Sequence, residues 1–494
     1  MYNFRRTVTT FMWSLLARKH IILLTAACIG VIVFTFVYVR PPAVSFARQR
    51  VALYRFNNMS DARFIYDFEY LMWALEENWP FFNLSVSAND VDVWELADNM
   101  RYILHTTDVG HPHDFLDLLH ENFLAPIGQL GHLRAWRQYE DYINTLGMTL
   151  SSIRRHESME PVLRGVHFPI EEILYPDRLA VFSRIFCERN VPEYYMLWFN
   201  ALTRPETITF YQTLRDAGRC TPPRPPDERR LLRMETIEEG GIAYLGVSRM
   251  INVYDDRGFT WNSRNMGWYE SRLFHFFYGI VDYDHLIIDL RGNRGGWHWH
   301  FDMFIARPAS GGRNLLFPLY VFYTGGEYSV RTRTAFADSS RGGLLGRTVP
   351  LGRFRSLAET SIEYGIRSSY GTFAHSGTRD EFWQNALFGG KVWLLTDGYT
   401  ASGAEAATVA LKYSRLATVV GEETRGIFGT GHEPLGMHIS LPNTGILLRM
   451  DIAYYTDTHG RPFQGYGISP HYFNRPGYDA LETVLQMIAE RAGG

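Results

Sequence analysis

The sequence predicts an α/β core that follows a mainly helical segment and one N-terminal transmembrane helix. Short apolar runs after residue 230, such as Ile242–Val247 and Val392–Leu395, are typical of buried strands. Helical patterns over residues 264–280 and 403–414 separate runs of this kind. Strands that alternate with helices and are apolar throughout indicate a sheet covered by helices on its faces. We therefore expect the α/β core to occupy residues 231–494.

The segment before this core has a helical pattern. Phe64, Phe68 and Leu71 recur at the spacing of one helix face. Residues 61–220 are accordingly expected to form a mainly helical N-terminal domain. Residues 221–230 read TPPRPPDERR, and such a proline-rich composition is typical of an extended, exposed linker. The main domain boundary is expected at this linker.

The N-terminus carries an uncharged apolar run, Ile21–Val39, which is long enough to cross a bilayer as one helix. Basic residues flank this run on both sides. We expect an uncleaved signal anchor, with residues 1–20 in the cytoplasm, a linker over residues 40–60 and the rest of the chain extracytoplasmic at the cell membrane. A cleaved signal peptide is the closest alternative, since Ser45–Ala47 offers small residues at suitable offsets. A buried helix in a soluble core is the other alternative for this apolar run.

The composition argues against nucleic-acid binding, because the 494 residues carry a net charge of −3 and no basic excess. Of the three cysteines, Cys28 lies in the apolar run, and Cys187 and Cys220 are able to pair in an oxidising compartment. Neither a CxxC nor an HExxH sequence is present. Metal sites need several converging ligands, so we expect no metal and no other cofactor.

The stretch 400-TASGAE-405 places a serine at the start of a predicted helix, shortly after the predicted strand Val392–Leu395. Serine is a preferred helix N-cap, because its side-chain oxygen accepts a hydrogen bond from a free helix N–H. The same position also suits a nucleophile, since helix N–H groups stabilise an anion. From this stretch alone, Ser402 is open to both interpretations.

A second motif, 284-DHLIIDLRGNRGG-296, runs from an apolar strand into a turn that contains Gly292, Gly295 and Gly296. Neighbouring glycines let a backbone approach a ligand closely and present bare N–H groups to it. A tight strand-to-helix turn is the simpler interpretation. A phosphate loop is disfavoured, because neither GxxxxGK[ST] nor GxGxxG occurs.

Together these motifs resemble the C-terminal processing (tail-specific) protease family, whose superfamily includes the tricorn protease core and the interphotoreceptor retinoid-binding protein repeats. DHLIIDLRGNRGG is similar to the family's strand-and-glycine motif, and TASGAE is similar to its nucleophile turn. Further similar segments, in the family's order, are 129-QLGH-132, 416-LATVVGEETRGIFGTG-431 and 460-GRPFQGYGISPH-471. The resemblance implies a ClpP/crotonase-like α/β core, a serine endopeptidase that acts on polypeptides, and Ser402 as its nucleophile.

The resemblance offers two kinds of catalytic base. Processing proteases use a lysine that follows the serine, but no lysine occurs after Lys412, which would lie roughly 15 Å along the helix from Ser402. The tricorn-like branch uses a histidine from the helical segment, and His132 stands at the matching place. A neutral imidazole is a suitable base for a serine hydroxyl. We therefore expect His132 as the base, with His298 and His300 as alternatives.

In the tricorn-like branch, a glutamate of the closing segment supports the catalytic groups, and the matching residue here is Gln464. An amide accepts a hydrogen bond from imidazole but supplies no charge to stabilise imidazolium. Glu405 is an alternative orienting acid, although a structural role in the first turn of the helix suits its charge. Backbone N–H groups of Gly403 and of Gly295 or Gly296 are the expected oxyanion donors.

The alternative function is an inactive protein on the same fold that binds a peptide or an apolar ligand, with Gln464 as its main support. A Ser402–His132 separation beyond roughly 6 Å would favour this alternative. Residues 137–230 show no recognisable PDZ pattern and look mostly helical. The enzyme interpretation implies a polypeptide substrate, membrane attachment through the N-terminal helix, no nucleic acid and, as an open option, an oligomer.

Overall fold

The computed structural model describes most of the chain after residue 58. The described residues are 59–82, 84–155, 193–219, 231–250, 263–296, 298–313, 315–331, 347–354, 362–371, 383–428 and 436–492, with isolated residues between 174 and 186. The apolar run 21–39, the proline-rich segment 221–230 and both Cys187 and Cys220 lie outside these ranges. Within them, no helix is long and apolar enough to cross a membrane.

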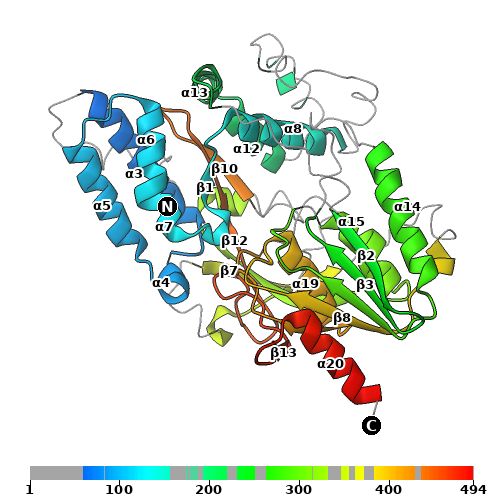
Figure 1. The fold of residues 1–494 in the computed structure, drawn as a ribbon. Helices are drawn as coiled ribbons and strands as arrows, with labels where there is room; N and C mark the ends of the chain where they lie inside the picture. Colours follow the sequence, from blue (N-terminus) through cyan, green and yellow to red (C-terminus); the bar gives the residue numbers. More distant parts are fainter. Residues whose placement is uncertain are drawn as a thin grey trace, which may run out of the picture. The chain divides into compact units, whose positions relative to one another are not determined.

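A mixed six-stranded sheet lies at the centre of the described core, in the order β13-β9-β8-β4-β3-β2 (Figure 1). Strands β3, β4, β8, β9 and β13 pair in parallel, and β2 pairs antiparallel with β3 at the edge. The strands are β2 (Leu232–Glu238), β3 (Ile242–Val247), β4 (His285–Asp289), β8 (Lys391–Thr396), β9 (Ala417–Gly421) and β13 (Tyr472–Phe473). This confirms the predicted α/β core, with apolar strands that alternate with helices.

Helices cover both faces of this sheet, because successive side chains of a strand point to opposite faces. Leu286 and Ile288 of β4 join the larger apolar cluster with α14 (Ser263–Gly279) and α19 (Gly403–Tyr413). Ile287, between them, packs in a second cluster with the C-terminal helix α20 (Ala480–Ala492). Both faces are therefore dry, which explains why the strands read as continuous apolar runs.

Two smaller antiparallel sheets extend the core. One has the order β12-β5-β7-β6, and the other has the order β1-β11-β10. Their strands are β5 (Leu316–Thr324), β6 (Arg347–Thr348), β7 (Ile362–Gly371), β12 (Ala453–Thr456), β1 (Arg134–Ala135), β10 (Gly436–Ser440) and β11 (Leu447–Asp451). Strands β10 and β11 form a hairpin around the turn at Asn443–Gly445.

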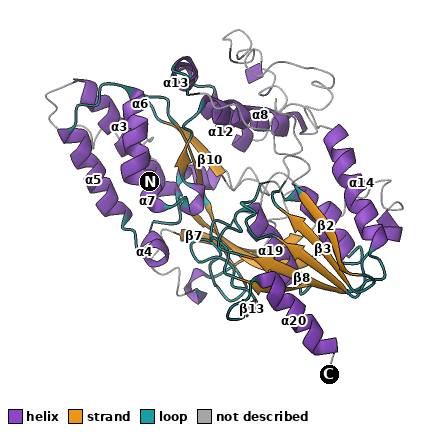
Figure 2. Cartoon of the chain, viewed as in Figure 1, coloured by secondary structure: helices purple, strands orange, loops and turns teal. Residues whose placement is uncertain are grey.

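The segment before the core is helical, and in Figure 2 its helices form two groups, one from α3 to α7 and the other of α8, α12 and α13. They are α3 (Met59–Asn78), α4 (Leu84–Asn89), α5 (Val93–Thr106), α6 (Pro112–Leu119), η1 (His120–Leu124), α7 (Ala125–Ile127), η2 (Leu130–His132), α8 (Tyr139–Arg155), α12 (Glu193–Leu202) and α13 (Pro205–Asp216). Short helical turns in the core are α15 (Trp299–Phe301), η4 (Asp302–Ala306), α16 (Arg307–Ala309), η5 (Leu351–Arg353) and η7 (Gln384–Ala386).

The helical segment also contributes a strand to the core. Strand β1, directly after η2, pairs antiparallel with β11, so that Arg134 lies opposite Arg449 and Ala135 opposite Leu448. Asn58–Gly494 accordingly forms one compact unit. This pairing brings the end of η2, at His132, beside the C-terminal end of β11.

Candidate active site

Ser402 lies at the junction between the turn after β8 and helix α19. Its φ of 53° and ψ of −118° are unusual for a residue with a Cβ. Backbone strain of this kind costs on the order of 1–3 kcal/mol and persists only where the surroundings hold it in place. Such strain is common at functional sites, and it distinguishes Ser402 from an ordinary N-cap, which has extended backbone angles.

His132 contacts this serine. Its Nε2 lies 3.0 Å from Ser402 Oγ, well inside the 6 Å limit stated above. His132 also has a positive φ, of 50°, in a short run of left-handed residues that includes Gly131. A Cβ on Gly131 would lie 2.4 Å from the Phe81 ring and 2.8 Å from Trp79 Nε1. Glycine at 131 therefore lets the turn pack on these two rings and direct His132 toward α19.

Asp451 is the third member of this group. Its Oδ2 lies 2.6 Å from Nδ1 of His132, and its side chain is only 2% exposed. Asp451 ends β11, and the pairing of β11 with β1 places it near His132. The sequence interpretation missed this residue. The available signal was a carboxylate within the apolar run LLRMDIAYY, because a buried charge requires a partner.

Gln464 does not occupy the position predicted for it. Its Oε1 accepts a hydrogen bond from Tyr455 N at 2.9 Å, and its Nε2 donates to Ala453 O at 3.4 Å. Both ring nitrogens of His132 are already paired with Ser402 and Asp451. The prediction that Gln464 stands at the acid position was therefore wrong. The carboxylate of Asp451 occupies the position beside His132 Nδ1. Gln464 is a fully buried residue that joins β12 to the closing segment.

The predicted oxyanion glycines lie against the serine. A Cβ on Gly295 would come within 2.5 Å of Ala401 O and 2.8 Å of Ser402 Cβ, so the two turns pack without any side chain between them. The N–H of Gly295 donates to Asn293 Oδ1 at 2.9 Å and is therefore not available to a ligand. Among the described residues, the N–H groups of Gly296 and Gly403 have no backbone or side-chain acceptor.

The side chain of Glu405 fixes the turn that contains Ser402. Its Oε2 accepts hydrogen bonds from Ser402 N and Ile427 N, each at 2.9 Å, and its Oε1 accepts from Thr424 Oγ1 and Gly426 N. Complete burial raises the pKa of Glu405 to about 7, although these four donors lower it. Glu405 therefore joins the serine turn to the segment 424–427, which agrees with the structural role favoured above.

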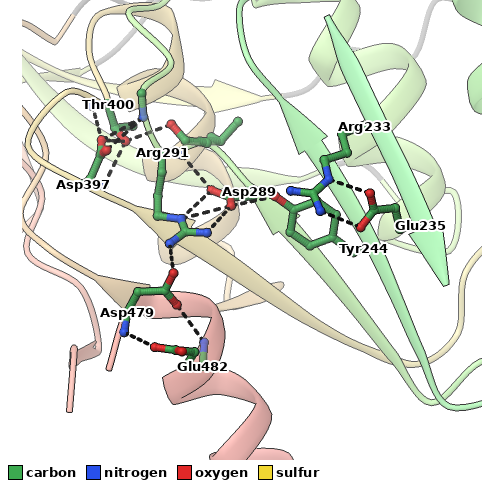
Figure 3. Close-up of polar contacts among 11 residues, drawn as sticks. Arg233, Glu235, Tyr244, Asp289, Arg291, Asp397, Thr400, Asp479 and Glu482 are labelled. Carbon is green, nitrogen blue, oxygen red and sulfur yellow. Dashed lines mark hydrogen bonds and ion pairs between the residues drawn. The ribbon is translucent and has the colours of Figure 1, made fainter. Parts of the chain in front are cut away.

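A polar network ties the glycine turn to the serine turn (Figure 3). The carboxylate of Asp397 accepts hydrogen bonds from Gly292 N, at 3.0 Å, and from Thr400 N, at 2.9 Å. Thr400 Oγ1 lies 3.0 Å from Leu290 O and donates to it. One carboxylate thus fixes both turns relative to each other, although sequence reasoning had not singled it out.

The same network reaches the C-terminal helix. Arg291 forms an ion pair with Asp289, at 2.7 Å, and another with Asp479 at the start of α20, at 3.0 Å (Figure 3). Tyr244 donates its hydroxyl to Asp289 at 2.8 Å. Helix α20 is therefore fixed to the end of β4, directly before the glycine turn.

The other candidate bases lie elsewhere. Lys412 donates to Ser469 O near the end of α19, which agrees with its exclusion as a base. His298 is buried and lies 3.4 Å from Asp302, and His300 stacks on Phe304. His132 is thus the predicted base that the structure brings to Ser402. Within the described ranges, no group of three His, Cys, Asp or Glu side chains is arranged to hold a metal ion.

The geometry supports proton transfer from the serine. A carboxylate only accepts hydrogen bonds, so Nδ1 of His132 carries the proton toward Asp451, which leaves Nε2 as the acceptor for Ser402 Oγ–H. A serine, an imidazole and a buried carboxylate in this order are the groups that activate a hydroxyl for nucleophilic attack.

Part of the chain matches a known protein family. Residues 242–473 match peptidase family S41. Among curated proteins, none is similar enough in sequence to match the chain. Mature CPAF is similar in structure at 12% identity, over 88% of this chain and 96% of that chain, with a TM-score of 0.45.

Two further solved structures are more distant. A lipoprotein from Streptococcus agalactiae is 12% identical over 72% of this chain and 97% of its own, with a TM-score of 0.34. The photosystem II D1 C-terminal processing protease is 16% identical over 50% of this chain and 46% of its own, with a TM-score of 0.28. Likenesses at these TM-scores add nothing about mechanism, so the family match rests on residues 242–473.

Proposed function

We propose that the chain is an active serine endopeptidase of peptidase family S41, which residues 242–473 match, with a Ser402–His132–Asp451 triad. The observation that carries this proposal is the continuous hydrogen-bonded line from Ser402 Oγ through His132 to Asp451, with distances of 3.0 and 2.6 Å. His132 comes from the helical segment and the other two from the core, so folding of both is needed to assemble the site.

In the proposed reaction, Ser402 Oγ attacks the carbonyl carbon of the scissile peptide bond. Nε2 of His132 takes the hydroxyl proton and then delivers it to the leaving amine. Asp451 keeps the ring in the required tautomer and stabilises the imidazolium that forms. Water, activated by the same Nε2, then hydrolyses the acyl-enzyme and restores Ser402.

The oxyanion of the tetrahedral intermediate is assigned to the N–H groups of Gly403 and Gly296. Both lie in the two turns that pack against Ser402, and donors at such positions each contribute about 2.7–4 kcal/mol to the transition state. Gly295 contributes only by its lack of a side chain, because its N–H already donates a hydrogen bond to Asn293 Oδ1.

Attachment to the membrane is a separate part of the proposal. The apolar run Ile21–Val39 supports an N-terminal signal anchor, with the peptidase on the extracytoplasmic side of the cell membrane. Alkaline extraction of membranes tests this directly. A chain released by alkali, or one that lacks the residues before about 48, would contradict an uncleaved anchor.

The catalytic proposal is tested by labelling the full-length chain with a fluorophosphonate, which reacts with activated serines. We expect wild type to be labelled and both Ser402→Ala and His132→Ala to be unlabelled. Ser414→Ala and His459→Ala are matched controls, because Ser414 lies at the other end of α19 and the His459 side chain is 80% exposed. A folded wild type without labelling would favour the alternative of an inactive binding protein.

A further inference from the structure

A row of basic side chains crosses the three-stranded sheet beside the triad. Arg134 of β1 lies opposite Arg449 of β11, and Arg449 lies opposite His438 of β10. Residues paired in this way project from the same face of a sheet. Asp451 follows Arg449 by two positions and so lies on that face as well.

His438 is buried, Arg134 and Arg449 are partly exposed, and the row is short of negative charge. Burial, and then the charge of Arg449, lowers the pKa of Arg134 to about 10. Burial and both arginines lower the pKa of His438 to about 3. Among the described residues, Nε of Arg134, Nε of Arg449 and Nδ1 of His438 have no hydrogen-bond partner.

The carboxylates near the row do not neutralise it. Oδ1 of Asp451 lies 3.9 Å from Arg449, a long contact, while its Oδ2 is committed to His132. Asp141 acts on Arg134 only as a nearby charge. Arg134 is instead stacked on the Trp136 ring, at 4.2 Å from the ring centroid. Arg449 is therefore paired only with the carboxylate that already serves the triad, and Arg134 has Asp141 as a nearby charge without a hydrogen bond.

The row is also accessible at its centre. The side chain of Arg449 is 29% exposed. Its guanidinium lies over Gly436, where a Cβ would stand 3.0 Å from Arg449 Nε. The absence of a side chain at 436 therefore leaves the guanidinium room beside Asp451. An arginine with free donors and an open side is suited to bind a carboxylate.

We propose that Arg134 and Arg449 form a substrate subsite for an acidic side chain, Asp or Glu, of the polypeptide held at the triad. This inference rests on the proposed peptidase function and deepens it, because it assigns a preference to that site. The basic row begins two residues after His132, and Arg449 lies two residues before Asp451. An acidic residue bound there lies only a few residues from the scissile bond.

The test measures how well peptides protect Ser402 of the full-length chain from fluorophosphonate labelling. The peptides are capped at both ends and consist of alanine with a single Glu, or a single Gln, moved through the positions. At one position, we expect the Glu peptide to give half protection at a concentration about tenfold lower than the Gln peptide, as a charge-assisted hydrogen bond implies. Equal protection by Glu and Gln at every position would overturn the subsite.

Variants identify the arginines. Arg449→Gln and Arg134→Gln are expected to abolish the preference for Glu, and Arg449→Lys to retain part of it. Arg233→Gln is the control, since Arg233 lies on the edge strand β2 and is 66% exposed. The comparison of Glu and Gln peptides uses the wild-type chain alone. It therefore tests the subsite even if the Arg449→Gln protein does not fold. A preference that persists in folded Arg449→Gln and Arg134→Gln proteins would overturn the assignment.

Two other outcomes are separated by design. Absence of labelling in the wild type without any peptide contradicts the peptidase function itself and not the subsite alone. Protection that depends on a free C-terminal carboxylate, and not on Glu, would show that the row binds a chain end and would overturn the acidic side-chain proposal. If Arg449 only positioned Asp451, Arg449→Gln would slow labelling without peptide and leave the Glu preference intact.

Discussion

His132 Nδ1 and Asp451 Oδ2 lie 2.6 Å apart, although 319 positions separate the two residues in the chain. Strand β1 makes this contact possible, because its pairing with β11 brings the end of the helical segment to the end of a core strand. Asp451 supplies the negative charge that an amide at Gln464 does not have. The main argument for an inactive protein, the missing acid, therefore no longer applies.

The Asp451→Asn variant tests this contact. An amide at 451 supplies no charge to stabilise the imidazolium and is able to donate to Nδ1, which would leave the proton on Nε2 and remove the acceptor for Ser402. We expect the rate of labelling or hydrolysis to fall by about 10³–10⁴-fold, as for comparable triads. A loss smaller than tenfold in a folded protein would mean that Asp451 is not the orienting acid.

The Gln464→Glu variant gives the opposite contrast. Gln464 is fully buried, with Oε1 facing Tyr455 N and Nε2 facing Ala453 O. A carboxylate would place one oxygen against the Ala453 carbonyl, which has no proton to give. We expect no gain in activity and a loss of roughly 1–3 kcal/mol in the free energy of unfolding, measured with urea. Increased activity would restore Gln464 to the catalytic group.

The sequence was sufficient to predict the elements that have strong local patterns. The apolar strands β4 and β8, the glycine turn after β4 and the serine at the start of α19 each carry a pattern over consecutive residues. Asp451 carries no such pattern, because its role depends on a two-residue strand, Arg134–Ala135, that is too short to recognise. The resemblance to the tricorn-like branch instead directed the search for the acid to Gln464 of the closing segment.

Glu405→Gln tests how the serine turn is held. The carboxylate accepts four hydrogen bonds, two on each oxygen. A glutamine amide supplies one acceptor oxygen, and its NH₂ group faces two donors whichever way it is turned. We expect labelling to fall and the free energy of unfolding to drop by roughly 1–3 kcal/mol. Glu422→Gln on the exposed segment after β9 is the control and is expected to change neither.

The pH dependence of stability offers an independent test of Glu405. Its pKa is raised by burial from 4.5 to about 7 in the folded chain, so between these values the folded state binds a proton that the unfolded state releases. Stability from this group is therefore present below pH 4.5, decreases as the pH rises toward 7, and changes no further above it. The full effect is on the order of 3 kcal/mol.

Comparison of wild type with Glu405→Gln isolates this effect, since glutamine does not titrate. The difference between their unfolding free energies, measured in urea from pH 5 to 8, is expected to shrink as the pH rises toward 7. A difference that stays constant over this range would show that Glu405 titrates near its ordinary value and remains charged in the folded chain.

Gly295 and Gly292 form a natural pair for testing the oxyanion arrangement. Both have a positive φ, of 88° and 73°, so an alanine meets similar backbone strain at either position. The surroundings differ, because a Cβ at 295 would lie 2.7 Å from Gly403 N, whereas a Cβ at 292 meets no atom within 4 Å. We expect Gly295→Ala to force the serine and glycine turns apart and reduce labelling by at least about 10²-fold, since one oxyanion donor is worth that much. Gly292→Ala is expected to cost about 1 kcal/mol of stability and to keep most of its labelling. Equal loss in the two variants would trace the effect to backbone strain and not to the packing of these turns.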